Sequence, residues 1–177
     1  MLNNIAALLD SGAVAAVGDY ESIATANGTG SSGVITFSSI PSTYKHIQIR
    51  YIARSTSGAD GFITLNGSTS ASRRHWVSGD GSSAGAASDA LGYVVPTAGS
   101  SDAANIMGVG VIDILDYADT NKNKVTRTLG GIDRNGSGYV ILFSGLWITT
   151  SAISSLSITA ASGSWNTATT FALYGVK

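Results

Sequence analysis

Few side chains in this sequence are of the types that carry out acid, base or nucleophilic chemistry. Histidine occurs only at His46 and His75, cysteine is absent, and no serine lies in a GxSxG segment that would expose it on a sharp turn. The acids are Glu21 and ten aspartates, most of them in or beside predicted turns, where an aspartate bonds its own backbone. A catalytic carboxylate pair needs burial to separate its two pKa values, and only Asp113 lies within an apolar strand-like segment. We therefore expect no enzymatic activity.

One run of residues offers oxygen ligands at close spacing. The segment DYADTNKN at residues 116–123 contains four of them: Asp116, Asp119, Asn121 and Asn123. Calcium accepts such ligands, but the segment lacks the glycine and the distant glutamate of an EF-hand loop. An ordinary turn between two strands, rich in Asp and Asn, is therefore the favoured interpretation. We expect no metal and no other cofactor.

Two aromatic positions are candidates for contact with a partner. The densest cationic and aromatic run consists of Arg73, Arg74, His75 and Trp76, and such a run suits a carboxylate, a sugar or a neighbouring subunit. Like charges on an edge strand also prevent unwanted pairing of sheets, an interpretation of at least equal weight. Trp165 either stacks on a sugar ring or covers one end of the fold, and we favour the second.

The composition predicts a weakly charged surface. Charged residues make up 12% of the 177 residues, against roughly 25% in a typical soluble domain. Ser, Thr, Asn and 22 Gly must then supply the polar surface, and low surface charge favours association. A net charge of −1 provides no basic field for nucleic acid, and no apolar run approaches the roughly 20 residues that cross a bilayer. We expect neither nucleic acid nor membrane as a partner.

The first 19 residues form a segment of their own. No Lys or Arg precedes their apolar stretch and Asp10 interrupts it, so we interpret them as mature protein rather than a signal peptide. Leu2, Ile5, Ala6 and Leu9 recur at helical spacing, and the candidate attachment residues are Leu2, Ile5, Leu8 and Leu9. The spacing predicts one short amphipathic helix, too short to be stable alone in water. It must dock on the end of the β domain or on another subunit, and we expect residues 1–19 to act in attachment or assembly.

From Tyr20 onward, short stretches of period two alternate with Gly, Ser and Asn clusters, which is typical of an all-β protein. The predicted strands are Tyr20–Ala26, Gly33–Phe37, His46–Ser55, Gly61–Asn66, Arg73–Val77, Leu91–Val95, Asn105–Tyr117, Lys124–Asp133, Tyr139–Thr149, Ile153–Thr159 and Phe171–Val176. Asn66-Gly67 and Asn135-Gly136 are each predicted to close a tight hairpin, because both residue types tolerate positive φ. The segment Gly79–Asp89 is small and polar and is predicted to be a loop. Residues 20–177 are thus predicted to form one antiparallel β-sandwich of the jelly-roll type.

Two predicted strands have informative patterns. In His46–Ser55 the residues Ile47, Ile49, Tyr51 and Ala53 share one face, which predicts a half-buried strand. In Tyr139–Thr149 both faces are apolar, so this strand is either central or packed against a partner chain. Its candidate assembly residues are Tyr139, Phe143 and Trp147.

Five segments, in their order along the chain, resemble a widespread group of bacteriophage virion proteins. They are YESIATA at Tyr20–Ala26, GVITFSSIPSTYKHIQIR at Gly33–Arg50, DYADTNKNKVTRTLGG at Asp116–Gly131, SGLWITTSAISSLSI at Ser144–Ile158 and FALYGVK at Phe171–Lys177. The group contains tail-associated and capsid-associated proteins, and no single segment is a catalytic signature. The resemblance implies a virion structural domain with a β-sandwich core, often assembled as a trimer.

Because fold alone does not settle function, the resemblance leaves several roles. Only about 19 residues precede the first predicted strand, whereas tail components of this kind usually carry a longer stalk. We therefore expect a capsid decoration, or cement, protein on the outside of the shell, made in the host cytoplasm. Its expected partners are its own copies in a homotrimer and the major capsid protein or other virion proteins. The alternatives are a receptor- or glycan-binding module of a tail fibre or baseplate, and a glycan-active enzyme; a glycan partner is expected only at the tail.

Overall fold

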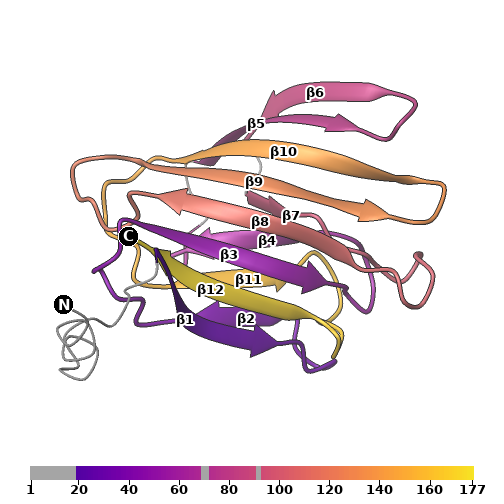
Figure 1. Ribbon diagram of the computed structural model, residues 1–177, viewed down its shortest axis with the longest axis horizontal. Coiled ribbons are helices and arrows are strands. Elements are labelled where there is room, and N and C mark those ends of the chain that lie inside the picture. Colours follow the sequence, from indigo (N-terminus) through magenta and orange to yellow (C-terminus); the bar gives the residue numbers. More distant parts are fainter. Residues whose placement is uncertain (1–18, 69–71, 91–92) are drawn as a thin grey trace, which may run out of the picture.

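The computed structural model describes residues 19–68, 72–90 and 93–177, which form strands and no helix (Figure 1). The strands are β1 (Tyr20–Asn27), β2 (Val34–Phe37), β3 (His46–Ala53), β4 (Gly61–Leu65), β5 (Ser72–Gly79), β6 (Ala84–Asp89), β7 (Tyr93–Val95), β8 (Gly108–Leu115), β9 (Lys124–Asp133), β10 (Gly138–Trp147), β11 (Leu156–Ala160) and β12 (Thr170–Val176). Each predicted strand overlaps one of these, and the prediction of an antiparallel all-β protein is confirmed. The helix predicted near the N-terminus lies outside the described residues. In the described part of the chain, no helix is long and apolar enough to span a membrane.

The strands form two antiparallel sheets. The larger has the order β1-β12-β3-β8-β9-β10-β5-β6 and the smaller has the order β2-β11-β4-β7. Figure 1 shows the smaller sheet behind the lower part of the larger one. From β1 to β4, and again from β7 to β8 and from β11 to β12, successive strands alternate between the sheets. The hairpins β5–β6 and β9–β10 interrupt this alternation, and both extend the larger sheet.

The core lies between the facing sides of the two sheets, as β3 illustrates. Its residues Ile47, Ile49 and Ala53 are fully buried and Tyr51 is nearly so, whereas Arg50 on the opposite face is exposed. The alternation predicted for this strand is therefore confirmed. Each fully buried Ile or Leu stabilises the fold by about 1.5–3 kcal/mol relative to exposure.

Trp165 packs between the two sheets at one end of the fold. Its indole is fully buried and meets the ring of Phe171 edge to face, with centroids 5.2 Å apart. The indole Nε1 donates to the carbonyl oxygen of Ile158 at 3.2 Å. A Cβ placed on Gly61 would lie only 2.8 Å from the indole, so the smaller sheet leaves room for the ring at this glycine. The interpretation of Trp165 as a residue that covers the end of the fold is confirmed.

One of the two hairpin predictions is confirmed, whereas the hairpin predicted at Asn66-Gly67 and the predicted loop are wrong. Asn135 and Gly136 have φ of 58° and 108° and close the β9–β10 hairpin. Asn66 and Gly67 also have positive φ, but beyond this turn the chain leaves the smaller sheet and next pairs with β10 through β5. The predicted loop Gly79–Asp89 is wrong, because most of it is β6, paired along its whole length with β5. Its small side chains bury little, and backbone pairing is sufficient to form the strand.

The turn between β5 and β6 is organised by one carboxylate. Asp80 Oδ1 accepts hydrogen bonds from the backbone N–H of Ser82 at 2.9 Å and of Ser83 at 2.7 Å. Gly81 between them has a φ of 89°, which favours glycine. Asp80 N in turn donates to the carbonyl of Ser83, so the two strands leave the turn as an antiparallel ladder.

Candidate functional site

The predicted contact patch on β5 does not exist as one surface. Arg73 and His75 are exposed, Arg74 is buried and Trp76 is half-buried, because successive side chains of a strand point to opposite faces. Arg74 donates to both oxygens of Asp89, at 2.7 and 3.0 Å, and its guanidinium lies 5.1 Å from the centre of a core phenylalanine ring. The four residues are therefore divided between the two faces, and Arg74 has a structural partner of its own.

The candidate assembly residues of β10 also point inward. Phe143 and Trp147 are 6% and 4% exposed within the single chain, and Tyr139 is half-buried. The strand is central, with β9 on one side and β5 on the other. Of the two interpretations of its double apolar pattern, the structure favours the central strand for these residues. The opposite face of β10, with Val140 61% and Leu142 39% exposed, is the face available for contact.

Val140 and Leu142 belong to an apolar surface on the outer face of the larger sheet, which we call the outer face. Its most exposed apolar residues come from four further strands as well as β10. They are Ile52, Val77, Val109, Leu129, Val140 and Leu142. The strand register places Val77, Leu142, Leu129 and Val111 in one row that crosses the sheet. Contiguous exposed apolar surface of this kind marks sites of interaction.

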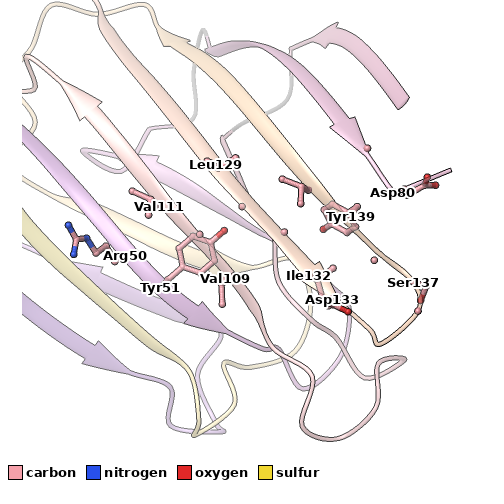
Figure 2. A pocket seen from close by; sticks show the side chains of 18 residues that line it. Arg50, Tyr51, Asp80, Val109, Val111, Leu129, Ile132, Asp133, Ser137 and Tyr139 are labelled. Atoms are coloured by element: carbon pink, nitrogen blue, oxygen red, sulfur yellow. The ribbon is translucent and has the colours of Figure 1, made fainter. Parts of the chain in front are cut away.

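A shallow groove of about 800 Å³ runs across this outer face (Figure 2). In the row beside Leu129, Gly131 lies between Val109 and Val140 and contributes no side chain, so the groove has a glycine floor between apolar walls. Figure 2 shows Arg50 at one end and Asp80 near the other. Glycines, aliphatic residues and two tyrosines, Tyr51 and Tyr139, line the groove. Its most exposed apolar side chains are the aliphatic ones, which suits contact with an apolar protein surface.

Beneath the groove, the inner face of the same strands holds Tyr51. A Cβ on Gly110 or Gly130 would lie 2.4 or 2.8 Å from the Tyr51 hydroxyl, so the ring occupies the space that side chains would fill there. The hydroxyl is buried and has no hydrogen-bond partner among the described residues. Burial raises its pKa well above the ordinary value. Tyr51 thus supports the floor of the groove from inside.

A polar network lies between the β9–β10 hairpin and the smaller sheet. The Tyr139 hydroxyl donates to the Asp60 carboxylate at 3.1 Å, and the backbone N–H of Thr97 donates to the same oxygen at 3.3 Å. The Arg134 guanidinium lies 5.9 Å from the centre of the Tyr139 ring and pairs with Asp102. Burial raises the pKa of both Asp60 and Tyr139. Because Asp60 precedes β4, this network holds the hairpin against the smaller sheet.

The Asp- and Asn-rich turn at residues 116–123 is organised by lysines. Asp116 pairs with Lys45 at 3.0 Å and with Lys122 at 2.8 Å, and hydrogen bonds from these lysines, with Lys122 the stronger, lower the pKa of Asp116 to about 2. Asp119 accepts a hydrogen bond from the backbone N–H of Asn121 at 2.7 Å. In the described ranges, no group of three or more His, Asp or Glu side chains is placed to hold a metal.

Lys124 supplies the turn with a buried positive charge. Its side chain is fully buried, and its Nζ donates to the carbonyl oxygens of Asp119, Lys122 and Thr150. Burial lowers the pKa of the ammonium group. One cation therefore connects the turn that precedes β9 to the segment that follows β10.

Among the described residues, the two histidines and Asp113 lie in separate surroundings. His46 Nδ1 accepts a hydrogen bond from the backbone N–H of Asp116 at 3.0 Å, and His75 is exposed on β5. Asp113 faces outward, accepts from Gln48 at 2.7 Å and pairs with Arg127 at 3.3 Å. In the described part of the chain, neither histidine is hydrogen-bonded to a hydroxyl group, as nucleophile activation requires.

No family model, curated protein or solved structure matches this chain. The resemblance to phage virion proteins therefore depends on the five quoted segments. Leu2, Ile5, Leu8 and Leu9 lie outside the described residues.

The outer face was not predicted from the sequence, because its residues are aliphatic and spread over several strands, yet one signal was present. Arg127 shares its face of β9 with Val125 and Leu129, and a charged side chain usually marks the solvent side.

Proposed function

We propose that this chain is a non-enzymatic structural protein of a bacteriophage particle, a decoration protein that binds the outer surface of the capsid and stabilises it as a homo-oligomer. The observation that carries the proposal is the outer face. A chain with only 12% charged residues exposes Val140, Leu129 and their neighbours around a groove of about 800 Å³. A surface protein of an assembly needs such a contact face, whereas an enzyme needs converging polar groups.

The strand order supports the same proposal. If the hairpins β5–β6 and β9–β10 are left out, the strand orders of the two sheets are β1-β12-β3-β8 and β2-β11-β4-β7. This is the order of an eight-stranded jelly roll, a double-sheet architecture that viral capsid proteins use. We propose that the domain is a jelly roll whose larger sheet is widened by two inserted hairpins. The extra strands β9 and β10 carry much of the outer face, so the insertion would create the contact surface.

The outer face should bind the major capsid protein, and substitution tests this directly. L129K and V140K place a charge in the apolar contact, and each should weaken binding to undecorated capsids about 10-fold or more, since one buried aliphatic side chain contributes about 1.5–3 kcal/mol. V34K is the matched control, because Val34 is 48% exposed on the smaller sheet and Leu129 is 54% exposed. Equal binding of all three variants would exclude the outer face as the contact.

The number of copies in each particle separates the decoration role from the tail role. A decoration protein occurs in many symmetric copies on the shell, whereas a tail fibre or baseplate module occurs in a few copies and binds a receptor or glycan. Quantitative mass spectrometry of purified particles measures this number. Only a few copies in each particle would contradict the capsid role and favour a role in the tail.

On sequence grounds we also propose that the segment of residues 1–19 acts in attachment. If Leu2, Ile5, Leu8 and Leu9 dock on the shell or on a sister subunit, deletion of the segment should abolish particle binding and leave the β domain folded by circular dichroism. A truncated chain that decorates particles normally would remove this part of the proposal.

A further inference from the structure

Four strands lie at the edges of the two sheets, and three of them are protected against pairing with another chain. β2 and β7 are only four and three residues long. β1 has a register shift between Ser22 and Ala24, and beside it Glu21 pairs with Lys177. Short length, bulges and charges are the usual means by which proteins prevent edge-to-edge association.

The fourth edge strand, β6, has none of these protections. It is six residues long, AGAASD, contains no Lys, Arg or Pro, and pairs with β5 without a register shift. Its one charged residue, Asp89, is engaged by Arg74 of the same chain. Figure 1 shows the β5–β6 hairpin at the top of the larger sheet, away from the smaller sheet. Among the described strands, none pairs with the outer edge of β6, which leaves this edge open to a strand of another chain.

The register identifies which backbone groups are free. Asp80 N donates to Ser83 O, so these residues form the first hydrogen-bonded pair of the hairpin. Hydrogen-bonded and non-hydrogen-bonded pairs alternate along an antiparallel ladder, and Ala84, Ala86 and Ser88 therefore direct their N–H and C=O groups away from β5. These three residues are the ones that a further strand would bond.

We propose that β6 pairs with β6 of a second copy, antiparallel across a two-fold axis at Ala86, so that the two larger sheets become one. In this register Ala84 lies opposite Ser88 of the second copy and Asp89 lies opposite Ser83. The side chains are small, and no like charges meet. Self-pairing is thus sterically and electrostatically favourable, which a strand of arbitrary sequence does not guarantee.

This inference rests on the proposed function in one respect, because a structural subunit needs contacts with its own copies. Pairing along one short strand is a small contact, and it gains strength when the particle holds neighbouring copies in place. The two outer faces would lie on the same side of the joined sheet, so the pair would present both to one shell.

Introduction of a charge at the two-fold axis tests the pairing. Ala86 is exposed, so A86K and A86E should leave the fold intact, but each brings two like charges together across the axis. Sedimentation velocity over a concentration series that reaches the millimolar range should show the unmodified chain moving from 17.9 kDa toward twice that mass. A86K and A86E alone should remain monomeric, an equimolar mixture should recover the dimer, and A86S, which adds no charge, should behave as the unmodified chain.

A chain that stays monomeric at all concentrations, or a trimer whose mass A86K does not change, would overturn the pairing. So would a dimer that A86K and A86E leave intact. Capsid binding by the unmodified chain in those cases would leave the proposed function standing. Conversely, a charge-sensitive dimer that binds no particle would retain the pairing and remove the proposed function.

Discussion

Replacement of Trp165 by alanine should produce the largest loss of stability of any single substitution in the loop between β11 and β12. The change removes a fully buried indole, its edge-to-face contact with Phe171 and its hydrogen bond to Ile158. Deletion of a buried Trp costs about 3–5 kcal/mol, because transfer free energy is lost and a cavity remains. For a domain of this size each kcal/mol lowers the melting temperature by about 2–4 °C, so a drop of about 6–20 °C is expected.

Urea denaturation followed by circular dichroism measures the effect, and the slope of the transition should stay unchanged if only stability is altered. Trp76 provides a matched control, because it is the same residue type but is half-buried on the β5–β6 hairpin, outside the space between the sheets. Trp76→Ala should therefore cost clearly less than Trp165→Ala. A W165A variant as stable as the unmodified chain would refute the placement of this indole in the core and would return it to the role of a sugar-stacking residue.

Two further predictions concern the charged groups around the turn at residues 116–123. Lys124→Met should lower the free energy of unfolding by about 1–3 kcal/mol, because three carbonyl oxygens lose their donor. Lys45→Met, at an exposed position, should lower it less. Equal losses for the two variants in urea titrations would contradict this prediction. Asp116, whose pKa is lowered to about 2, should contribute stability that is present above about pH 4 and lost as the pH falls toward 2. D116N should therefore be less stable than the unmodified chain at neutral pH, and the difference should vanish near pH 2; a difference that does not depend on pH would show that Asp116 is not stabilised by its lysines.

Period-two patterns located the strands because side-chain alternation and burial coincide wherever one face of a sheet is polar. In β3, the charged Arg50 marks the outer face and Ile49 the core, so the sequence alone determines which way the strand faces. β10 has no such marker. Tyr139 and Val140 are both apolar enough to be inside, and only the neighbouring strands decide that the face with Tyr139 points inward and the face with Val140 points outward.

β6 could not be found from its own side chains, because Ala, Gly and Ser have little preference for strands. Its existence depends on the backbone of β5 and on the turn at Asp80 and Gly81, a dipeptide that is itself a turn signal. The arrangement of strands into two sheets is a further step beyond the sequence. Pairing of β12 with both β1 and β3 joins segments from opposite ends of the chain, and no local pattern specifies such a contact.

The turn at residues 116–123 contains a cation that is part of the chain, the ammonium group of Lys124. A free ion leaves its site when its concentration falls below the dissociation constant, whereas a tethered charge keeps an effective concentration fixed by the covalent structure. The three carbonyl oxygens around Nζ are thus held independently of the ionic composition of the medium. In the proposed role on a phage particle, dilution of the medium outside the host would not remove this charge from the fold.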